Sequence, residues 1–187
     1  MTLWVWIIGG LSIGAHLCAV IWSIIFPERR LWPVTKSTVF NQICIWGTTT
    51  AAFLALIYIG VSDWNALGFP ISFRWGLGGA LILFGNIVVW KEVVGIGWKA
   101  TSGGIGRLKT NGFYNYSRNP QYVADIAMIT GWVILSGSQN VLPFAALGIL
   151  VFTLAPFAEE PWLTENYGHA YETYKKRVPR FFGLPKE

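Results

Sequence analysis

Five long apolar stretches, separated by short polar segments, constrain this chain more than any other feature. They are Leu3–Phe26, Val39–Val61, Trp75–Trp90, Tyr122–Leu135 and Val141–Ala158. A helix needs roughly 20 apolar residues to cross the bilayer core, and tilt or local thinning accommodates the short fourth and fifth stretches. Because backbone amides in lipid must be hydrogen-bonded within the chain, we predict an all-α integral membrane protein with about five transmembrane helices.

The composition fits one membrane domain covering residues 1–187. Apolar residues make up 53% of the 187 residues and charged residues only 12%, which is too few for a fully solvated surface. Residues 1–94 are expected to supply N-terminal helices, whereas residues 95–187 carry the polar motifs.

The basic residues predict the orientation of the five helices. If the N-terminus lies outside, only Arg74 of the fourteen Lys and Arg residues falls on the outer side. Such a bias is what the positive-inside rule requires, so we expect the polar motifs on the cytoplasmic side. The net charge of +5 then reflects attraction to lipid headgroups. It does not indicate nucleic acid, because the basic residues lie at helix ends.

The histidines and cysteines do not suggest a metal or redox site. Cys18 and Cys44 lie within apolar stretches without CxxC spacing. His16 and His169 lie in different environments, and His16, alone on an apolar helix, is interpreted as a contact within the bundle.

Two polar motifs adjoin the last two apolar stretches, at residues 112–122 and 159–163. Pro120 suits the first turn of a helix with Asn119 as its N-cap. Pro161 is likewise expected to open a C-terminal helix, which would place Glu159 and Glu160 at a break between helices. The alternative to a functional role is that Asn119 only caps a helix and that Glu159 and Glu160 only solvate an interface.

Asp125 is a further candidate because it lies inside the fourth apolar stretch. It follows Tyr122 by three residues and so shares its helix face. A carboxylate at this depth is expected to face the bundle interior and to be functional. A structural pairing with Arg118 or another polar contact is the alternative.

Two segments flank these motifs. Residues 95–119 contain six glycines, and loops of this length are usually functional or mobile. The GxGxxA pattern at residues 95–100 follows no βαβ unit, so a Rossmann interpretation is rejected. After Glu160, Leu163, Tyr167, Tyr171 and Tyr174 recur at helical spacing and predict one amphipathic helix that rests on the membrane surface or caps the bundle.

Carboxylates, tyrosines and a glycine-rich backbone together suit a positively charged cofactor better than hydrolysis. Aromatic faces and oxygen atoms stabilise a sulfonium group. Methyl transfer from such a donor requires mainly in-line positioning and exclusion of water, with few catalytic side chains.

An ordered set of motifs resembles the membrane-integral methyltransferase superfamily, which includes isoprenylcysteine carboxyl methyltransferases and phosphatidylethanolamine N-methyltransferases. The resemblance covers about residues 95–179. It rests on Gly112-Phe113-Tyr114, on Arg118-Asn119-Pro120-Gln121-Tyr122, on Glu159-Glu160 and on Tyr167-Gly168-x-x-Tyr171-x-x-Tyr174.

The resemblance implies that S-adenosylmethionine is the cofactor and that a lipid or lipophilic substrate enters from the membrane. It also implies the residues that surround the cofactor. These are Asn119, Pro120, Tyr122 and Glu160, with Glu159 beside them and Gly112 and Tyr114 in the preceding lid segment.

The acceptor is expected to be a phospholipid-type amine. The carboxyl-methylating branch usually has His in place of Asn119 and an arginine shortly before the paired glutamates, whereas residues 150–158 contain no arginine. The tail after Tyr171 instead looks like the carboxyl branch, so that acceptor remains an alternative. An NADPH-dependent membrane reductase and a non-enzymatic membrane protein are further alternatives.

Three residues are candidates for catalysis on an amine acceptor. Asp125 or Glu159 would accept the proton that the nucleophile loses. Arg118 would bind the acceptor's phosphate or the cofactor's carboxylate.

Overall fold

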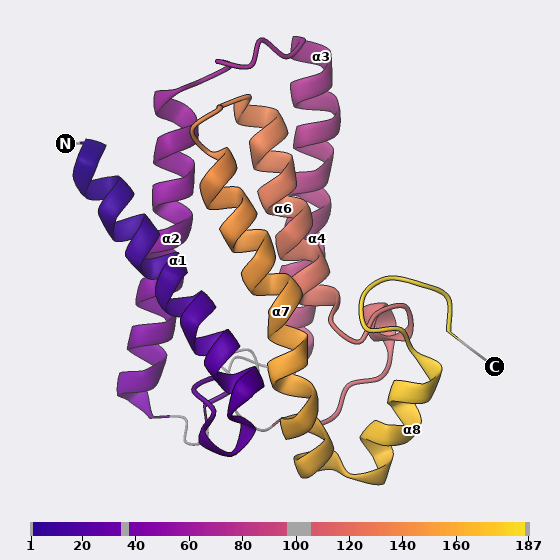
Figure 1. The fold of residues 1–187 in the computed structure, drawn as a ribbon. Helices are drawn as coiled ribbons and strands as arrows, with labels where there is room; N and C mark the ends of the chain where they lie inside the picture. The colour runs from indigo at the N-terminus through magenta and orange to yellow at the C-terminus, as the bar shows by residue number, and fades with distance from the viewer. Residues whose placement is uncertain (1, 35–37, 97–105, 186–187) are drawn as a thin grey trace.

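The computed structural model describes residues 2–34, 38–96 and 106–185, and within these ranges the chain forms helices and connecting segments. The long helices α1, α2, α4, α6 and α7 run alternately up and down in one bundle, and α8 lies beside the lower end of α7 (Figure 1). Their bounds are Thr2–Ile25 (α1), Val39–Ser62 (α2), Gly79–Ile96 (α4), Pro120–Ser136 (α6), Leu142–Tyr167 (α7) and His169–Arg177 (α8). The short helical segments are η1 (Pro27–Arg29), α3 (Ile71–Phe73), η2 (Arg74–Gly78) and η3 (Gly112–Asn115).

The architecture confirms the all-α integral membrane class. Four helices are long and apolar enough to cross a membrane: Leu3–Ile25, Val39–Ser62, Ile71–Gly95 and Leu142–Tyr167. Helix α6 has 17 residues, a rise of about 25 Å, and lies inside the bundle as the short fifth member. Leu11, Leu54 and Leu83 are each more than half exposed, as side chains that face lipid are.

Glycines allow the backbone of α6 to pack close to the backbones of α4 and of the preceding segment η2. A Cβ at Gly85 would lie 2.6 Å from the carbonyl oxygen of Ala124, and one at Gly131 would lie 2.8 Å from that of Gly78. Small residues at such crossings are typical of membrane helix pairs. The close packing fixes the position of α6, which carries Tyr122 and Asp125.

The start of α6 follows the sequence prediction in its backbone but not in its side chain. Pro120 occupies the first turn and Asn119 the N-cap position. The Asn119 side chain does not cap the helix; its amide nitrogen donates to the carbonyl oxygen of Arg180, 2.9 Å away. Asn119 therefore ties the helix start to the C-terminal segment.

The prediction of a helix break at Pro161 is wrong. Helix α7 continues through Pro161 to Tyr167, and Glu159 and Glu160 lie within it. The break comes at Gly168, whose φ of 53° favours glycine. Pro161 removes one backbone hydrogen bond, and side-chain partners of both glutamates hold this part of α7 in place.

The single amphipathic helix expected after Glu160 is therefore two helices. Leu163 and Tyr167 end α7, whereas Tyr171 and Tyr174 belong to α8. The four side chains still pack in one apolar cluster, together with Tyr114 and others. The turn at Gly168 folds the aromatic stripe back onto the segment before α6.

Candidate active site

A cavity of about 910 Å³ reaches from the α8 end of the molecule into the bundle. Side chains from α1, α2, α4, α6, α7 and α8 line it, as do residues of the segments before α2 and α6. Its walls are mainly aliphatic and aromatic, with a few polar groups. A large apolar cavity with convergent polar side chains is the usual form of a small-molecule site.

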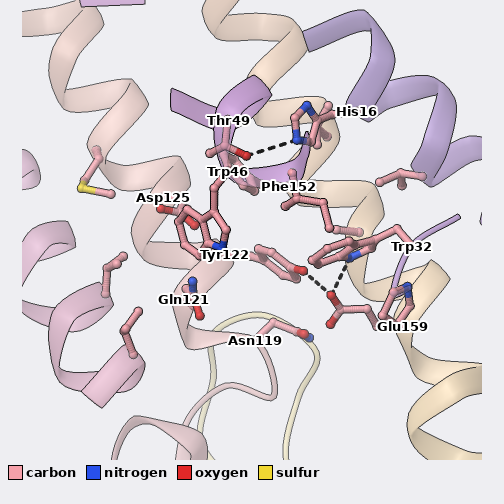
Figure 2. A pocket seen from close by; sticks show the side chains of 18 of the residues that line it. His16, Trp32, Trp46, Thr49, Asn119, Gln121, Tyr122, Asp125, Phe152 and Glu159 are labelled. Carbon is pink, nitrogen blue, oxygen red and sulfur yellow. Dashed lines mark hydrogen bonds between the residues drawn. The ribbon is translucent and has the colours of Figure 1, made fainter. Parts of the chain in front are cut away.

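Glu159 forms the central polar contact of this cavity. Its Oε1 accepts a hydrogen bond from the Trp32 ring nitrogen at 2.7 Å and another from the Tyr122 hydroxyl (Figure 2). Two donors on one oxygen fix the orientation of the carboxylate. The other oxygen, Oε2, has no hydrogen-bond partner among the residues that the structure describes.

The partners of Glu159 are themselves held in place. The backbone nitrogen of Trp32 donates to the Ser23 hydroxyl at 2.8 Å, and that hydroxyl donates to the carbonyl oxygen of Ala19 at 2.7 Å. The ring of Tyr122 packs against Phe152, with 5.8 Å between centroids. The site thus joins α1, α6 and α7 through side chains.

Asp125 faces the same cavity, about one turn along α6 from Tyr122 (Figure 2). Asp125 is only 8% exposed. Arg118, its candidate partner from the sequence, instead pairs with Glu160, Nη1 to Oε1, at 2.9 Å. Asp125 and Glu159 therefore give the cavity two acidic side chains.

Glu160 does not line the cavity but holds two arginines. Arg180 donates to it through Nε at 2.6 Å and Nη2 at 2.9 Å. The Arg180 guanidinium also lies 4.0 Å from the centre of the Phe157 ring. The hydrogen bond from Arg180 to Glu160 raises the arginine pKa, so this paired cation stays charged.

The tyrosines at the α8 end act as neutral hydrogen-bond donors. Tyr174 donates to the carbonyl oxygen of Tyr114 at 2.7 Å, and Tyr167 to that of Gly106 at 2.7 Å. Burial raises the pKa of Tyr171 to about 12 and also raises the pKa of Tyr114 and Tyr174. Tyr174 and Tyr167 thus fasten the segment before α6. The tyrosines with a raised pKa do not serve as bases near neutral pH.

The same segment carries an ion pair that sequence analysis missed. Lys109 lies 2.8 Å from the carboxylate of Glu92, a residue of α4 that is only 1% exposed. A glutamate near the end of an apolar helix was the available signal, since such a group needs a partner.

The structure brings most of the predicted site residues together. Those lining the cavity are Tyr114, Arg118, Asn119, Tyr122, Asp125 and Glu159. Three others lie off it: Gly112 forms a turn with φ of 68°, Pro120 opens α6, and Glu160 binds the arginines. Sequence analysis missed Trp32, His16 and Thr49, which also line the cavity.

No cluster of His, Cys, Asp or Glu suited to a metal ion occurs among residues 2–34, 38–96 and 106–185. The polar side chains that line the cavity include carboxylates, amides, hydroxyls and ring nitrogens, together with the cations Arg107, Lys109 and Arg118.

The sequence profile described as phospholipid methyltransferase matches residues 73–170. This range holds Asn119, Tyr122, Asp125 and both glutamates. The chain belongs to the phospholipid methyltransferase family. No solved structure matches it.

Curated relatives fall into two groups. A protein-S-isoprenylcysteine O-methyltransferase of Dictyostelium discoideum is 30% identical over 188 residues, covering 91% of this chain and 72% of the relative. Steroid 5-alpha-reductase DET2 of Solanum lycopersicum is 26% identical over 113 residues, covering 56% of this chain and 41% of the relative. Delta(14)-sterol reductase LBR of Gallus gallus is 32% identical over 81 residues, covering 42% of this chain and 13% of the relative. The chain thus spans less than half of the two reductases.

Proposed function

We propose that this family member transfers a methyl group from S-adenosylmethionine to a lipophilic acceptor bound in the cavity. The observation that carries the proposal is Glu159, an oriented carboxylate at the wall of a large, mostly apolar cavity. S-Adenosylmethionine would supply an electrophilic methyl group on a sulfonium centre.

The residues of the cavity fit this cofactor. Its sulfonium and ammonium groups are cationic, and carboxylates and aromatic faces attract cations. Glu159 supplies the carboxylate, and Trp32 and Tyr122 supply rings beside it. A volume of about 910 Å³ is near the upper end of ordinary ligand sites, which leaves room for an acceptor beside the cofactor.

The remaining predicted residues divide between binding and positioning. Asn119, Tyr122 and Tyr114 face the cavity and would bind the cofactor, with Glu159 as its main anionic partner. Glu160 would act indirectly, by holding Arg118. Gly112 and Pro120 would shape the backbone on either side of this segment.

An amine is the acceptor that the charges favour. The acidic groups Asp125 and Glu159 line the cavity, whereas two of its cations, Arg118 and Lys109, are already paired with Glu160 and Glu92. Asp125 would accept the proton that the amine loses. Arg118 would retain capacity to bind a phosphate.

A carboxyl acceptor is the second candidate, because the Dictyostelium relative, an isoprenylcysteine O-methyltransferase, aligns along nearly the whole chain. The alignments with reductases supply a third, an NADPH-dependent reduction. Under each candidate the α8 end would face the cytoplasm and the N-terminus the other side, by the positive-inside rule.

Equilibrium binding of S-adenosylmethionine to the detergent-purified protein tests the cofactor. Glu159→Gln removes the anion but keeps the shape, and we expect affinity to fall at least ten-fold, because charged hydrogen bonds contribute about 1.5–3 kcal/mol. Glu165→Gln is the matched control, since Glu165 lies on the same helix, exposed, in an ion pair with Arg30.

Equal affinity in wild type and Glu159→Gln would contradict the assignment of Glu159. Saturable NADPH binding without S-adenosylmethionine binding would replace methyl transfer with reduction. If the cofactor binds, transfer to phosphatidylethanolamine and to a prenylated cysteine then separates the two acceptors.

A further inference from the structure

A hydrogen-bonded pair of side chains lies in the half of the molecule that the family profile does not reach. His16 lies in the second half of α1 and Thr49 near the middle of α2, and both line the large cavity. The profile covers residues 73–170, so it assigns neither residue. An ionisable side chain such as His16 is energetically costly inside an apolar helix, so it is a candidate for a functional role.

The contacts of His16 determine what the pair can offer. Its Nδ1 lies 2.8 Å from the Ser12 carbonyl oxygen, which only accepts hydrogen bonds, so Nδ1 carries the proton. In the neutral ring Nε2 is then an acceptor, and the Thr49 hydroxyl lies 3.2 Å from it. If the Thr49 hydroxyl donates its proton to Nε2, the lone pairs of the Thr49 oxygen remain free to accept a hydrogen bond from a ligand. The pair therefore accepts hydrogen bonds and has no donor to spare.

The pair also lies at the border between the large cavity and a smaller apolar one. His16 and Thr49 border a second cavity of about 80 Å³ as well as the large one. Every other side chain around the small cavity is apolar, and Gly148 completes its lining. A polar ligand group that reaches the pair from the large cavity would find no hydrogen-bonding partner beyond it.

Two aromatic rings separate the pair from Glu159 and Asn119, two of the predicted cofactor residues, in the view of Figure 2. In Figure 2 His16 and Thr49 lie above Phe152 and Tyr122, while Glu159 and Asn119 lie below them. Both regions line the same cavity, so a cofactor at one and an acceptor at the other would share it.

We propose that the His16–Thr49 pair is the subsite for the acceptor, where it takes an N–H of a lipid amine. This inference rests on the proposed function and adds residues of α1 and α2 to it. A primary or secondary amine has N–H donors that match an acceptor pair. A carboxylate would find no donor there, so the pair selects against that acceptor.

Lipid binding without S-adenosylmethionine tests the subsite directly. The probes are phosphatidylethanolamine and phosphatidylcholine with the same labelled acyl chain, because they share the phosphate and differ in whether the nitrogen carries N–H. The protein is used in detergent micelles. We expect wild type to bind phosphatidylethanolamine about ten-fold more tightly, a value typical of one hydrogen bond from a charged donor.

Thr49→Val removes the hydroxyl with little change of shape, and it should bring the two lipid affinities within about two-fold of each other. Thr48→Val is the matched control. Thr48 also lines the cavity, but its hydroxyl bonds to the Cys44 carbonyl oxygen at 2.7 Å, so the preference should persist. His16→Phe should match Thr49→Val, and the double variant should lose no more than either.

Equal loss of the preference in Thr48→Val and Thr49→Val, or no preference in wild type, would overturn the subsite. Because these measurements contain no S-adenosylmethionine, they are independent of cofactor binding. A lipid preference that Thr49→Val abolishes, in a protein that does not bind S-adenosylmethionine, would retain the subsite and reject the methyl transfer.

Discussion

The two ends of the helix bundle use polar residues in different ways. At the end with α3, polar groups close the turns. Asp63 accepts hydrogen bonds from the Ser138 hydroxyl at 3.0 Å and the Asn140 backbone at 3.1 Å, and Arg74 donates to the Leu135 carbonyl oxygen at 2.8 Å. At the α8 end, Glu159 and Asp125 instead face a cavity. Hydrogen bonds between distant turns stabilise one end, whereas two carboxylates of the other end line a cavity.

Arg74 illustrates the difference best. It is the one basic residue that the positive-inside rule left on the outer side, yet it is only 6% exposed and lies 4.4 Å from the Trp64 ring centre. Its role is therefore internal. The arginines of the α8 end, Arg118 and Arg180, instead converge on Glu160 next to the cavity.

The largest effect on folding is expected from Glu160→Gln. The substitution leaves Arg118, a mostly buried cation, without its anionic partner, and breaking such a pair costs about 3 kcal/mol. Unfolding of the purified protein in detergent measures the loss. Cofactor affinity should fall with it, because Arg118 lines the cavity.

Glu165→Gln, the control for Glu159→Gln above, is also the control for Glu160→Gln. Glu165 pairs with Arg30 at 3.0 Å with its side chain 64% exposed, so its loss should cost less than about 1 kcal/mol. Similar losses for the two variants would show that the Glu160 cluster is an ordinary surface ion pair.

Arg74→Met is expected to have the next largest effect and to separate the two ends. It removes a buried hydrogen bond and a contact with Trp64, which together contribute about 2 kcal/mol. The free energy of unfolding should fall by that amount, while the dissociation constant of S-adenosylmethionine stays unchanged. A parallel loss of cofactor affinity would mean that the ends are coupled, and the comparison would fail.

The sequence predicted local features of the site well. Pro120 and Asn119 were placed correctly at the start of α6, because Pro at the first helical position is a preference of the backbone itself. Asp125 was placed in the interior by depth in an apolar stretch alone. The helical class followed from hydropathy, since lipid leaves few other folds.

Contacts between distant segments were beyond the sequence. Trp32 lies outside every motif considered in the sequence, yet it bonds to Glu159, 127 positions away. The break expected at Pro161 failed for a similar reason, because partners far along the chain hold α7 helical while Gly168 supplies the turn. His16 was interpreted as a bundle contact because nothing near it in sequence pointed to Thr49.

Tyr174→Phe should have a smaller effect, confined to the α8 end. It removes the hydrogen bond to the Tyr114 carbonyl oxygen, worth about 1 kcal/mol. Faster amide hydrogen exchange in residues 112–117 would detect the loosened segment. Tyr116→Phe is the control, because Tyr116 is exposed and should leave exchange unchanged. Unchanged exchange in Tyr174→Phe would mean that packing alone holds this segment.

The smallest effect is a difference in alkaline stability between wild type and Tyr171→Phe. Burial raises the pKa of Tyr171 from about 10 to about 12, so between these values the folded state keeps a proton that the unfolded state has lost. The contribution of Tyr171 to the stability of the folded state is complete below about pH 10 and declines as the pH rises through about 12. The midpoint temperature of thermal unfolding, measured from pH 8 to 11, should therefore fall more steeply in wild type than in Tyr171→Phe. Parallel curves would show that Tyr171 ionises as an exposed tyrosine does, and that the aromatic cluster at the α8 end does not exclude water from its hydroxyl.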